Sequence, residues 1–329
     1  MNLLRILTLA TVAIMSHHAI ANNTIDPLPS WNDTATKKGI IQYVQQTTNP
    51  DSMQFIPVSE RIATFDNDGT LWAEKPVYFQ LYFALDQIKA QASQHPEWKT
   101  EEPFASALKG DLEGVKKSGM EGLVKLVMAS HTGMSTEQFN ASVKAWIKTA
   151  RHPTTHRPFT EMVYQPMIEL LHYLQDNNFK TYIVSGGGVE FMRAWAPEVY
   201  RIPKEQILGS SVKTQYEIVN GKPTIMRLPE ISVNNDKAQK PLTIQTYIGK
   251  KPVIAVGNSD GDLEMLQWTK TSSYPSLALL VHHTDAEREW AYDKDSNVGH
   301  LEKALPLAKK DSWTVIDMKQ DWSQVFPKK

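Results

Sequence analysis

Three short apolar runs in this sequence each end in a loop of polar residues or glycines, and this arrangement constrains the fold more than any other feature. The runs cover residues 61–65, 181–185 and 252–256. Each has the length of a buried strand and is too short for a typical helix. Loops at the carboxyl ends of parallel strands meet at one edge of a sheet, where open α/β proteins bind ligands. The sequence therefore predicts an α/β fold with a parallel sheet flanked by helices.

The loop after the first run can bring two carboxylates together. It reads Asp66-Asn67-Asp68-Gly69-Thr70, and Gly69 permits a sharp turn. Side chains two positions apart on an extended chain point the same way, so Asp66 and Asp68 can converge. Such a pair suits either a nucleophile with a proton donor or a site for a hard cation such as Mg²⁺. A solvated Asp-Gly turn is the alternative, and this loop alone does not exclude it.

Two further positions carry groups that suit an anion. Ser185 has a hydroxyl that can bind a phosphoryl oxygen, and it precedes three glycines that let backbone N–H groups approach closely. Lys240 directly precedes an expected short helix that starts with Pro241 and runs to Tyr247. Lys237 is a competitor, and either lysine could simply lie at the surface. These residues alone leave the choice between the two lysines open.

The third run leads into an acidic loop and then an expected helix over residues 263–268. The loop reads Gly257-Asn258-Ser259-Asp260-Gly261-Asp262. It is too short for an EF-hand and lacks the distal glutamate of that motif, so a calcium loop is excluded.

In this order the four segments resemble the motifs of the haloacid dehalogenase superfamily, most of whose members are phosphohydrolases. The resemblance covers residues 61–317, and residues 277–292 resemble a phosphoserine-phosphatase-like subgroup. It implies a Rossmann-like core with an inserted helical cap. It implies these roles: catalysis by Asp66 and Asp68; binding of the substrate phosphate by Ser185, Gly186 and Lys240; and binding of Mg²⁺ by Asp66, Asp68, Asn258 and Asp262.

The sequence departs from the family pattern at Asn258, where an aspartate is usual. An amide oxygen can still bind a metal, but it brings no charge. We therefore expect weaker Mg²⁺ binding unless Asp260 or Asp262 supplies more of the negative charge.

The implied activity is Mg²⁺-dependent hydrolysis of small phosphomonoesters through an aspartyl-phosphate. Asp68 favours phosphate chemistry, since the dehalogenases that attack carbon lack this second aspartate. A phosphotransferase would use the same residues, and a catalytically weak secreted binding protein would fit Asn258. A formal net charge of -1 gives no field that would recruit nucleic acid, and the absence of cysteine excludes a thiol nucleophile. The expected partner is a small phosphorylated metabolite, and the oligomeric state is left open.

The chain is expected to divide into four parts. Residues 1–21 read as a secretory signal: a positive start, an apolar stretch too short to span a bilayer, and a small-residue cleavage site at Ala19-Ile20-Ala21. The mature protein is then secreted, or periplasmic in a bacterium, and not membrane-bound. Residues 22–75 form an arm and the first core strand, residues 76–160 the helical cap, and residues 161–329 the rest of the core.

Some residues near these motifs remain undecided from the sequence. Trp72 and Glu74 follow the first loop and could touch substrate, although Trp72 could equally pack at a hinge. Of His282 and His283, one could line the pocket, but a structural histidine is the stronger expectation. Arg193 could bind a second anionic group or form a surface ion pair. Residues 211–228 are expected to form a hairpin with its turn at Asn220-Gly221.

Overall fold

The computed structural model describes residues 26–328, so the predicted signal segment 1–21 lies outside the described residues. The sheet is built from β1 (Ile62–Phe65), β2 (Lys180–Gly188), β3 (Ile207–Val219), β4 (Lys222–Val233), β5 (Ile254–Gly257), β6 (Leu277–His282) and β7 (Thr314–Asp317). Its strand order is β4-β3-β2-β1-β5-β6-β7. Neighbouring strands are parallel except for β3 and β4, which form the expected hairpin. Asn220 and Gly221 at its turn both have positive φ, as a tight hairpin turn requires.

Strand β1 lies in the middle of the sheet, and its carboxyl end leads into the first acidic loop. Ala63 pairs with Thr181 of β2 on one side and with Ile254 of β5 on the other. The chain therefore leaves β1 toward one side of the sheet and later returns on the opposite side. This reversal opens a crevice at the carboxyl end of β1.

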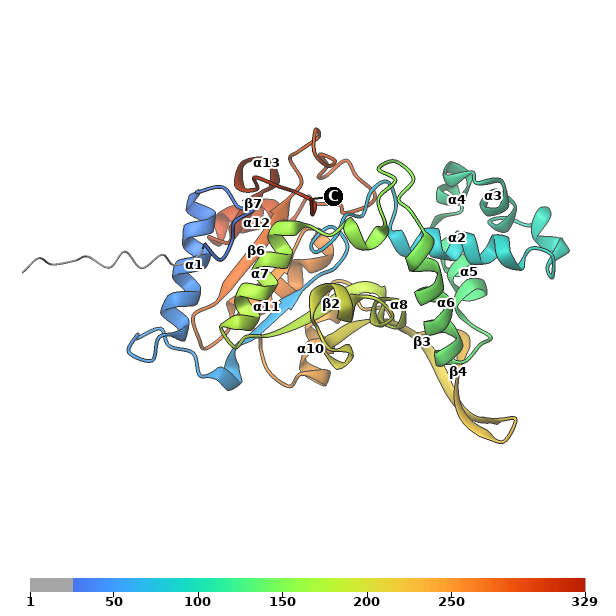
Figure 1. Cartoon of the computed structure of the whole chain (residues 1–329), viewed down its shortest axis with the longest axis horizontal. Coiled ribbons are helices and arrows are strands. Elements are labelled where there is room, and N and C mark those ends of the chain that lie inside the picture. Colours follow the sequence, from blue (N-terminus) through green and yellow to red (C-terminus); the bar gives the residue numbers. More distant parts are fainter. Residues whose placement is uncertain (1–25, 329) are drawn as a thin grey trace, which may run out of the picture.

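Different helices cover the two faces of the sheet (Figure 1). Successive side chains of β5 alternate between the faces, because Ile254 and Val256 join one apolar cluster and Ala255 joins the other. The first cluster includes α1 (Ala35–Thr48) and α7 (Gln165–Asp176), and the second includes α10 (Gln239–Tyr247), α11 (Leu263–Lys270) and α12 (Ala304–Lys310). The predicted α/β fold with a helix-flanked parallel sheet is confirmed.

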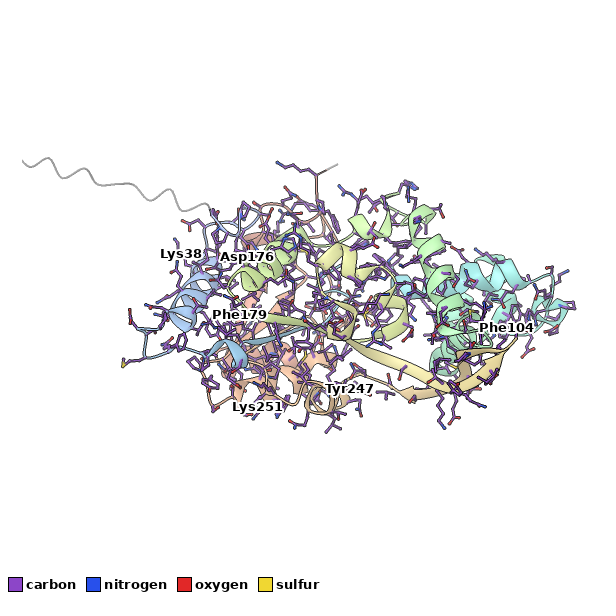
Figure 2. The ribbon with its side chains drawn as sticks, turned by 60° about the horizontal axis from the view of Figure 1, so that its bottom comes forward. Lys38, Phe104, Asp176, Phe179, Tyr247 and Lys251 are labelled. Atoms are coloured by element: carbon purple, nitrogen blue, oxygen red, sulfur yellow. The ribbon has the colours of Figure 1, made fainter. Side chains whose placement is uncertain are left out.

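A group of helices lies between β1 and β2 in the sequence, at the end of the molecule opposite α1 (Figure 1). Figure 2 marks these two ends by Phe104 and Lys38. The group consists of α2 (Phe79–Gln91), α3 (Phe104–Lys109), α4 (Leu112–Lys117), α5 (Gly119–His131) and α6 (Thr136–Thr149). Helices α2 to α5 share a small apolar cluster of their own. The buried side chains of α6 join the first cluster instead, and this helix begins with a capping box between Ser135 and Gln138.

The remaining elements are short. They are α8 (Val189–Arg193), α9 (Ala196–Tyr200), α13 (Met318–Asp321) and the 3-10 turns η1 (Val58–Glu60), η2 (Pro96–Lys99), η3 (Phe159–Glu161), η4 (Lys204–Gln206) and η5 (Asp260–Asp262). In the part of the chain that the structure describes, no helix is both long and apolar enough to cross a membrane.

One helix start differs from the sequence prediction. Helix α10 begins at Gln239, so Lys240 lies inside its first turn and not just before it. Pro241 is then the third helical residue. It is tolerated there because the first N–H groups of a helix have no partner within the helix.

Candidate active site

Asp66 lies at the carboxyl end of β1, where its N–H donates to the Val256 carbonyl at 2.9 Å. The chain then turns sharply, and Gly69 at this turn has a φ of +74°. A Cβ added to Gly69 would lie 2.1 Å from Nδ2 of Asn258. Both the backbone conformation and this close approach require glycine. The turn predicted from the sequence is therefore present, and it packs directly against the acidic loop.

Lys240 joins the first motif to the acidic loop. Its ammonium lies 2.7 Å from Oδ1 of Asp66 and 2.6 Å from Oδ1 of Asp262. The exposed fractions of Lys240, Asp66 and Asp262 are 2%, 6% and 0%. Burial alone would lower the pKa of Lys240, but the two carboxylates outweigh burial and raise it. Lys237 is exposed, so the geometry favours Lys240 at this position.

The two aspartates of the first motif have perturbed pKa values. Burial, followed by the nearby charge of Asp262, raises the pKa of Asp66 well above its ordinary value, while Lys240 opposes the shift. Burial also raises the pKa of Asp68. A carboxyl with a raised pKa keeps its proton closer to neutral pH, which suits a proton donor.

Trp72 fixes the orientation of Asp68. Its Nε1 donates to Oδ1 of Asp68 at 2.8 Å, and its ring stacks on Trp195 with centroids 4.2 Å apart. Trp72 is 1% exposed. It therefore packs in the core and holds Asp68, rather than facing a substrate.

Ser185 is fully buried, and its Oγ accepts the N–H of Gly187 at 3.0 Å. A Cβ added to Gly187 would lie 3.3 Å from Oγ of Ser185 and equally 3.3 Å from Oδ2 of Asp68. Side chains from β2 and from the loop after β1 thus meet at this glycine. Gly186 is exposed beside them.

The two aspartates of the acidic loop, Asp260 and Asp262, have different structural roles. Asp262 gives Oδ1 to Lys240, while its Oδ2 accepts the N–H groups of Asn258 (3.0 Å) and Ser259 (3.1 Å). Asp260 lies apart from this centre, since its carboxylate accepts backbone N–H groups at the start of α12, including that of Ala304 at 2.9 Å. Asp260 therefore caps a helix, and Asp262 holds Lys240 and the loop together.

The amide of Asn258 is oriented by two contacts. Its Oδ1 accepts the hydroxyl of Thr70 at 3.0 Å, and its Nδ2 donates to Oε1 of Glu74 at 2.9 Å. Tyr292 also donates to this Glu74 oxygen, at 2.7 Å. Burial raises the pKa of Glu74 to about 7.

His283 supports the first loop from behind. It is 2% exposed; its Nε2 donates to the Gly69 carbonyl at 2.8 Å, and its Nδ1 lies 3.2 Å from Oε2 of Glu289. The expectation of a structural histidine is therefore met by His283. Glu289 and Tyr292 were not expected here, because the segment after β6 shows no periodicity that would place them.

Gln80 and His131 connect the helical insertion to the glycines at the end of β2 and were also not expected. Gln80, in the first turn of α2, accepts the N–H of Gly188 at 2.8 Å. Its Nε2 lies 2.9 Å from Nε2 of His131, at the end of α5. Burial lowers the pKa of His131 to about 3, so this imidazole is neutral at pH 7. Neither residue belongs to a recognisable motif.

Arg193 has a structural role. It forms an ion pair with Glu190 at 3.5 Å and donates to the Lys204 and Ile207 carbonyls. It also lines a cavity of about 530 Å³ between α8, the hairpin and α10. None of the predicted site residues lines that cavity, so we do not assign the chemistry to it.

The residues around Asp66 fit a hard divalent cation. Among residues 26–328, no ready-made cluster of three or more His, Asp or Glu side chains could hold a metal. The donors near Asp66 are oxygens: the carboxylates of Asp66 and Asp68, and the amide of Asn258 on the neighbouring loop. Mg²⁺ prefers such donors, and several buried carboxylates around the single ammonium of Lys240 leave negative charge to be balanced.

Comparison with known proteins decides the family. A model of the haloacid dehalogenase-like hydrolases matches residues 63–267, which include every predicted site residue. The chain belongs to this family. The predicted family, fold and hydrolase class are thereby confirmed. No curated protein gave a significant match to the sequence.

Several solved structures resemble this haloacid dehalogenase-like hydrolase in fold. A phosphoserine phosphohydrolase-like protein from Francisella tularensis is 17% identical, with 79% of this chain and 95% of that chain covered and a TM-score of 0.39. A protein of unknown function from Anaerococcus prevotii is 16% identical, with 79% and 89% covered and a TM-score of 0.48. A probable phosphoserine phosphatase from Vibrio cholerae is 17% identical, with 85% and 76% covered and a TM-score of 0.37.

Proposed function

We propose that this hydrolase cleaves small phosphomonoesters through an aspartyl-phosphate formed on Asp66. One observation carries the proposal: Asp66 offers a carboxylate at a strand end, oriented by Lys240 at 2.7 Å, beside a second carboxyl with a raised pKa. Among the described residues, Lys240 binds Oδ1 of Asp66 and no partner binds Oδ2. That oxygen is available for attack on phosphorus.

In the first step, Oδ2 of Asp66 forms a bond to phosphorus and the bond from phosphorus to the ester oxygen breaks. The leaving oxygen takes a proton from Asp68, whose raised pKa keeps that proton available. Ser185 and Lys240 are placed to bind the phosphoryl oxygens, and their charge and hydrogen bonds stabilise the transferring group.

In the second step, Asp68 is ionised and takes a proton from water. The water oxygen forms a bond to phosphorus, the bond to Asp66 breaks, and inorganic phosphate leaves. Mg²⁺ would be held by Asp66, the Asp68 backbone carbonyl and Asn258, and when bound it would offset negative charge around the phosphate.

We also propose that the protein acts outside the cytoplasm, on small exported or extracellular phosphate esters. The support for this proposal is the signal-like pattern of residues 1–21.

The decisive experiment measures phosphate release from an aryl phosphate, with Mg²⁺ and with a chelator. Asp66→Asn keeps the shape but removes the attacking charge, so turnover should fall to background. Asp260→Asn is the matched control, since this helix-capping carboxylate should leave turnover largely unchanged. Near-normal turnover in Asp66→Asn would refute the mechanism.

Asp68 has a separate signature. Asp68→Asn should slow turnover by about 100-fold to 10,000-fold, the range typical of general acid–base catalysis. The loss should be larger for alkyl than for aryl phosphates, because an alkoxide is the poorer leaving group and depends more on protonation by Asp68. An equal loss for both classes would contradict the proton-donor role.

A further inference from the structure

Glu74 lies buried beside the position where the chain carries asparagine in place of the family's metal-binding aspartate. Glu74 is 2% exposed, and its Oε1 is 2.9 Å from Nδ2 of Asn258. A Cβ added to Gly69 would lie 2.4 Å from Oε1, and one added to Gly299 would lie 1.9 Å from it. Two glycines with positive φ therefore make room for this carboxylate, which indicates a built contact.

The charge of Glu74 has no direct counter-ion among the described residues. Its hydrogen-bond donors are the neutral amide of Asn258 and the neutral hydroxyl of Tyr292. The nearest lysine in the sequence, Lys75, is engaged elsewhere: its ammonium donates to the Val298 carbonyl and lies over the Tyr292 ring, 3.8 Å from the centroid. A buried carboxylate is costly unless a cation balances it. A divalent cation bound at Asn258 would supply that balance.

The amide of Asn258 lies between the carboxylate of Glu74 and the loop that follows β1. Because its Nδ2 donates to Glu74, its other end, Oδ1, faces away from Glu74 toward Thr70. A hydrogen bond to a carboxylate on one side of a ligand orients that ligand and strengthens it as a donor, as metal-bound histidines illustrate. An amide held in this way can offer its oxygen Oδ1 to a cation, while the negative charge lies on Glu74, on the other side of the amide.

We propose that Asn258 and Glu74 together replace one aspartate: Asn258 supplies the oxygen that binds a divalent cation, and Glu74 supplies the negative charge. Glu74 is a positioning residue, which acts through Asn258. The inference deepens the proposed function, on which it rests only for the place of the cation beside Asp66.

The test measures Mg²⁺ binding by calorimetry, without any phosphate ester. Glu74→Gln keeps the shape and the hydrogen-bond acceptor but removes the charge, so Mg²⁺ affinity should fall by about 10-fold to 100-fold, as for other residues behind a metal ligand. Asn258→Asp should raise the affinity. The double variant Glu74→Gln/Asn258→Asp moves the charge to position 258 and should restore binding close to the wild-type value.

A matched control separates charge from orientation. Tyr292→Phe removes the other hydrogen bond to Glu74 but leaves its charge, so Mg²⁺ affinity should change far less than in Glu74→Gln. Unchanged affinity in Glu74→Gln would overturn the inference. So would an equal loss in Tyr292→Phe, or a double variant that stays weak.

Folding defects and the proposed activity can be kept apart from this result. If Glu74→Gln alone does not fold, the double variant decides, because it must bind Mg²⁺ less tightly than Asn258→Asp, which keeps the charge of Glu74. If the charge exchange restores Mg²⁺ binding but no phosphate ester is cleaved, the inference stands and the proposed function fails. If phosphate is released and the wild type binds no Mg²⁺, the inference about Glu74 fails and the proposed function stands.

Discussion

Replacing Lys240 by methionine tests the electrostatic centre of the site. Methionine has a similar length, so the change removes the ammonium that lies 2.7 Å from Asp66 and 2.6 Å from Asp262 without opening a large cavity. All three side chains are almost completely buried. The two carboxylates then remain in a dry interior without their shared partner.

The expected cost follows from that burial. Removal of one partner from a buried ion pair typically destabilises a protein by about 3–5 kcal/mol. The carboxylates can escape part of this cost by taking up protons, so the cost must depend on pH. A carboxyl whose pKa is raised on folding destabilises the folded state increasingly as pH rises above its unfolded pKa. We therefore expect the full loss at pH 8 and a clearly smaller loss at pH 5.

Urea unfolding followed by tryptophan fluorescence, with a chelator present, measures both values. Lys237→Met is the matched control: it removes an exposed ammonium three residues earlier and should change stability by less than about 0.5 kcal/mol. A loss below about 1 kcal/mol for Lys240→Met, the range of surface ion pairs, would refute the reasoning. So would an equal loss at both pH values.

Two further predictions concern other parts of the chain. Burial lowers the pKa of His131 from 6.5 to about 3, so only the unfolded state takes up the proton and stability is lost as pH falls below 6.5. Between pH 7 and pH 4.5, the free energy of unfolding in urea should fall by about 3 kcal/mol less for His131→Gln than for the wild type. An equal fall for both proteins would contradict this prediction. Amino-terminal sequencing of the exported protein should start at or near Asn22, whereas an intact Met1 on a cytoplasmic protein would contradict the signal prediction.

The convergence of the first, second and fourth motifs could be predicted because a single rule places them. Asp66 and Asn258 follow β1 and β5, and Ser185 lies near the carboxyl end of β2; these strands are adjacent in the order β2-β1-β5. Parallel strands that lie side by side bring their carboxyl ends together. The sequence shows each strand as a short apolar run. No knowledge of distant packing is needed for this part of the site.

The residues that support the motifs could not be predicted in this way. Gln80 reaches Gly188 at the end of β2, with His131 behind it, because helices of the insertion pack there. Tyr292 comes from a segment without regular structure. Their positions depend on how remote elements pack, which leaves no local pattern in the sequence.

Helix α2 shows the same limit. Tyr78, Leu81, Tyr82 and Leu85 have the i, i+3, i+4, i+7 spacing that is typical of one apolar helix face. In the structure, however, Tyr78 is 44% exposed while Phe79 and Phe83 are fully buried. The helix contributes Phe79 and Phe83 to the main apolar cluster, and Leu85 and Ile88 to the separate one. With two apolar surfaces on one helix, spacing cannot identify the face that meets the core.

The balance of charge around Asp66 also sets an expected order of binding. At full ionisation Asp66, Asp68, Asp262 and Glu74 carry negative charge, and Lys240 is the cation that contacts this group in the described part of the chain. A phosphate ester brings further negative charge into the same buried space, where like charges repel strongly. Lys240 alone cannot offset both, because its charge is already shared by Asp66 and Asp262. We therefore expect Mg²⁺ to bind before the phosphate ester or together with it, and phosphate affinity without a divalent cation to be weak.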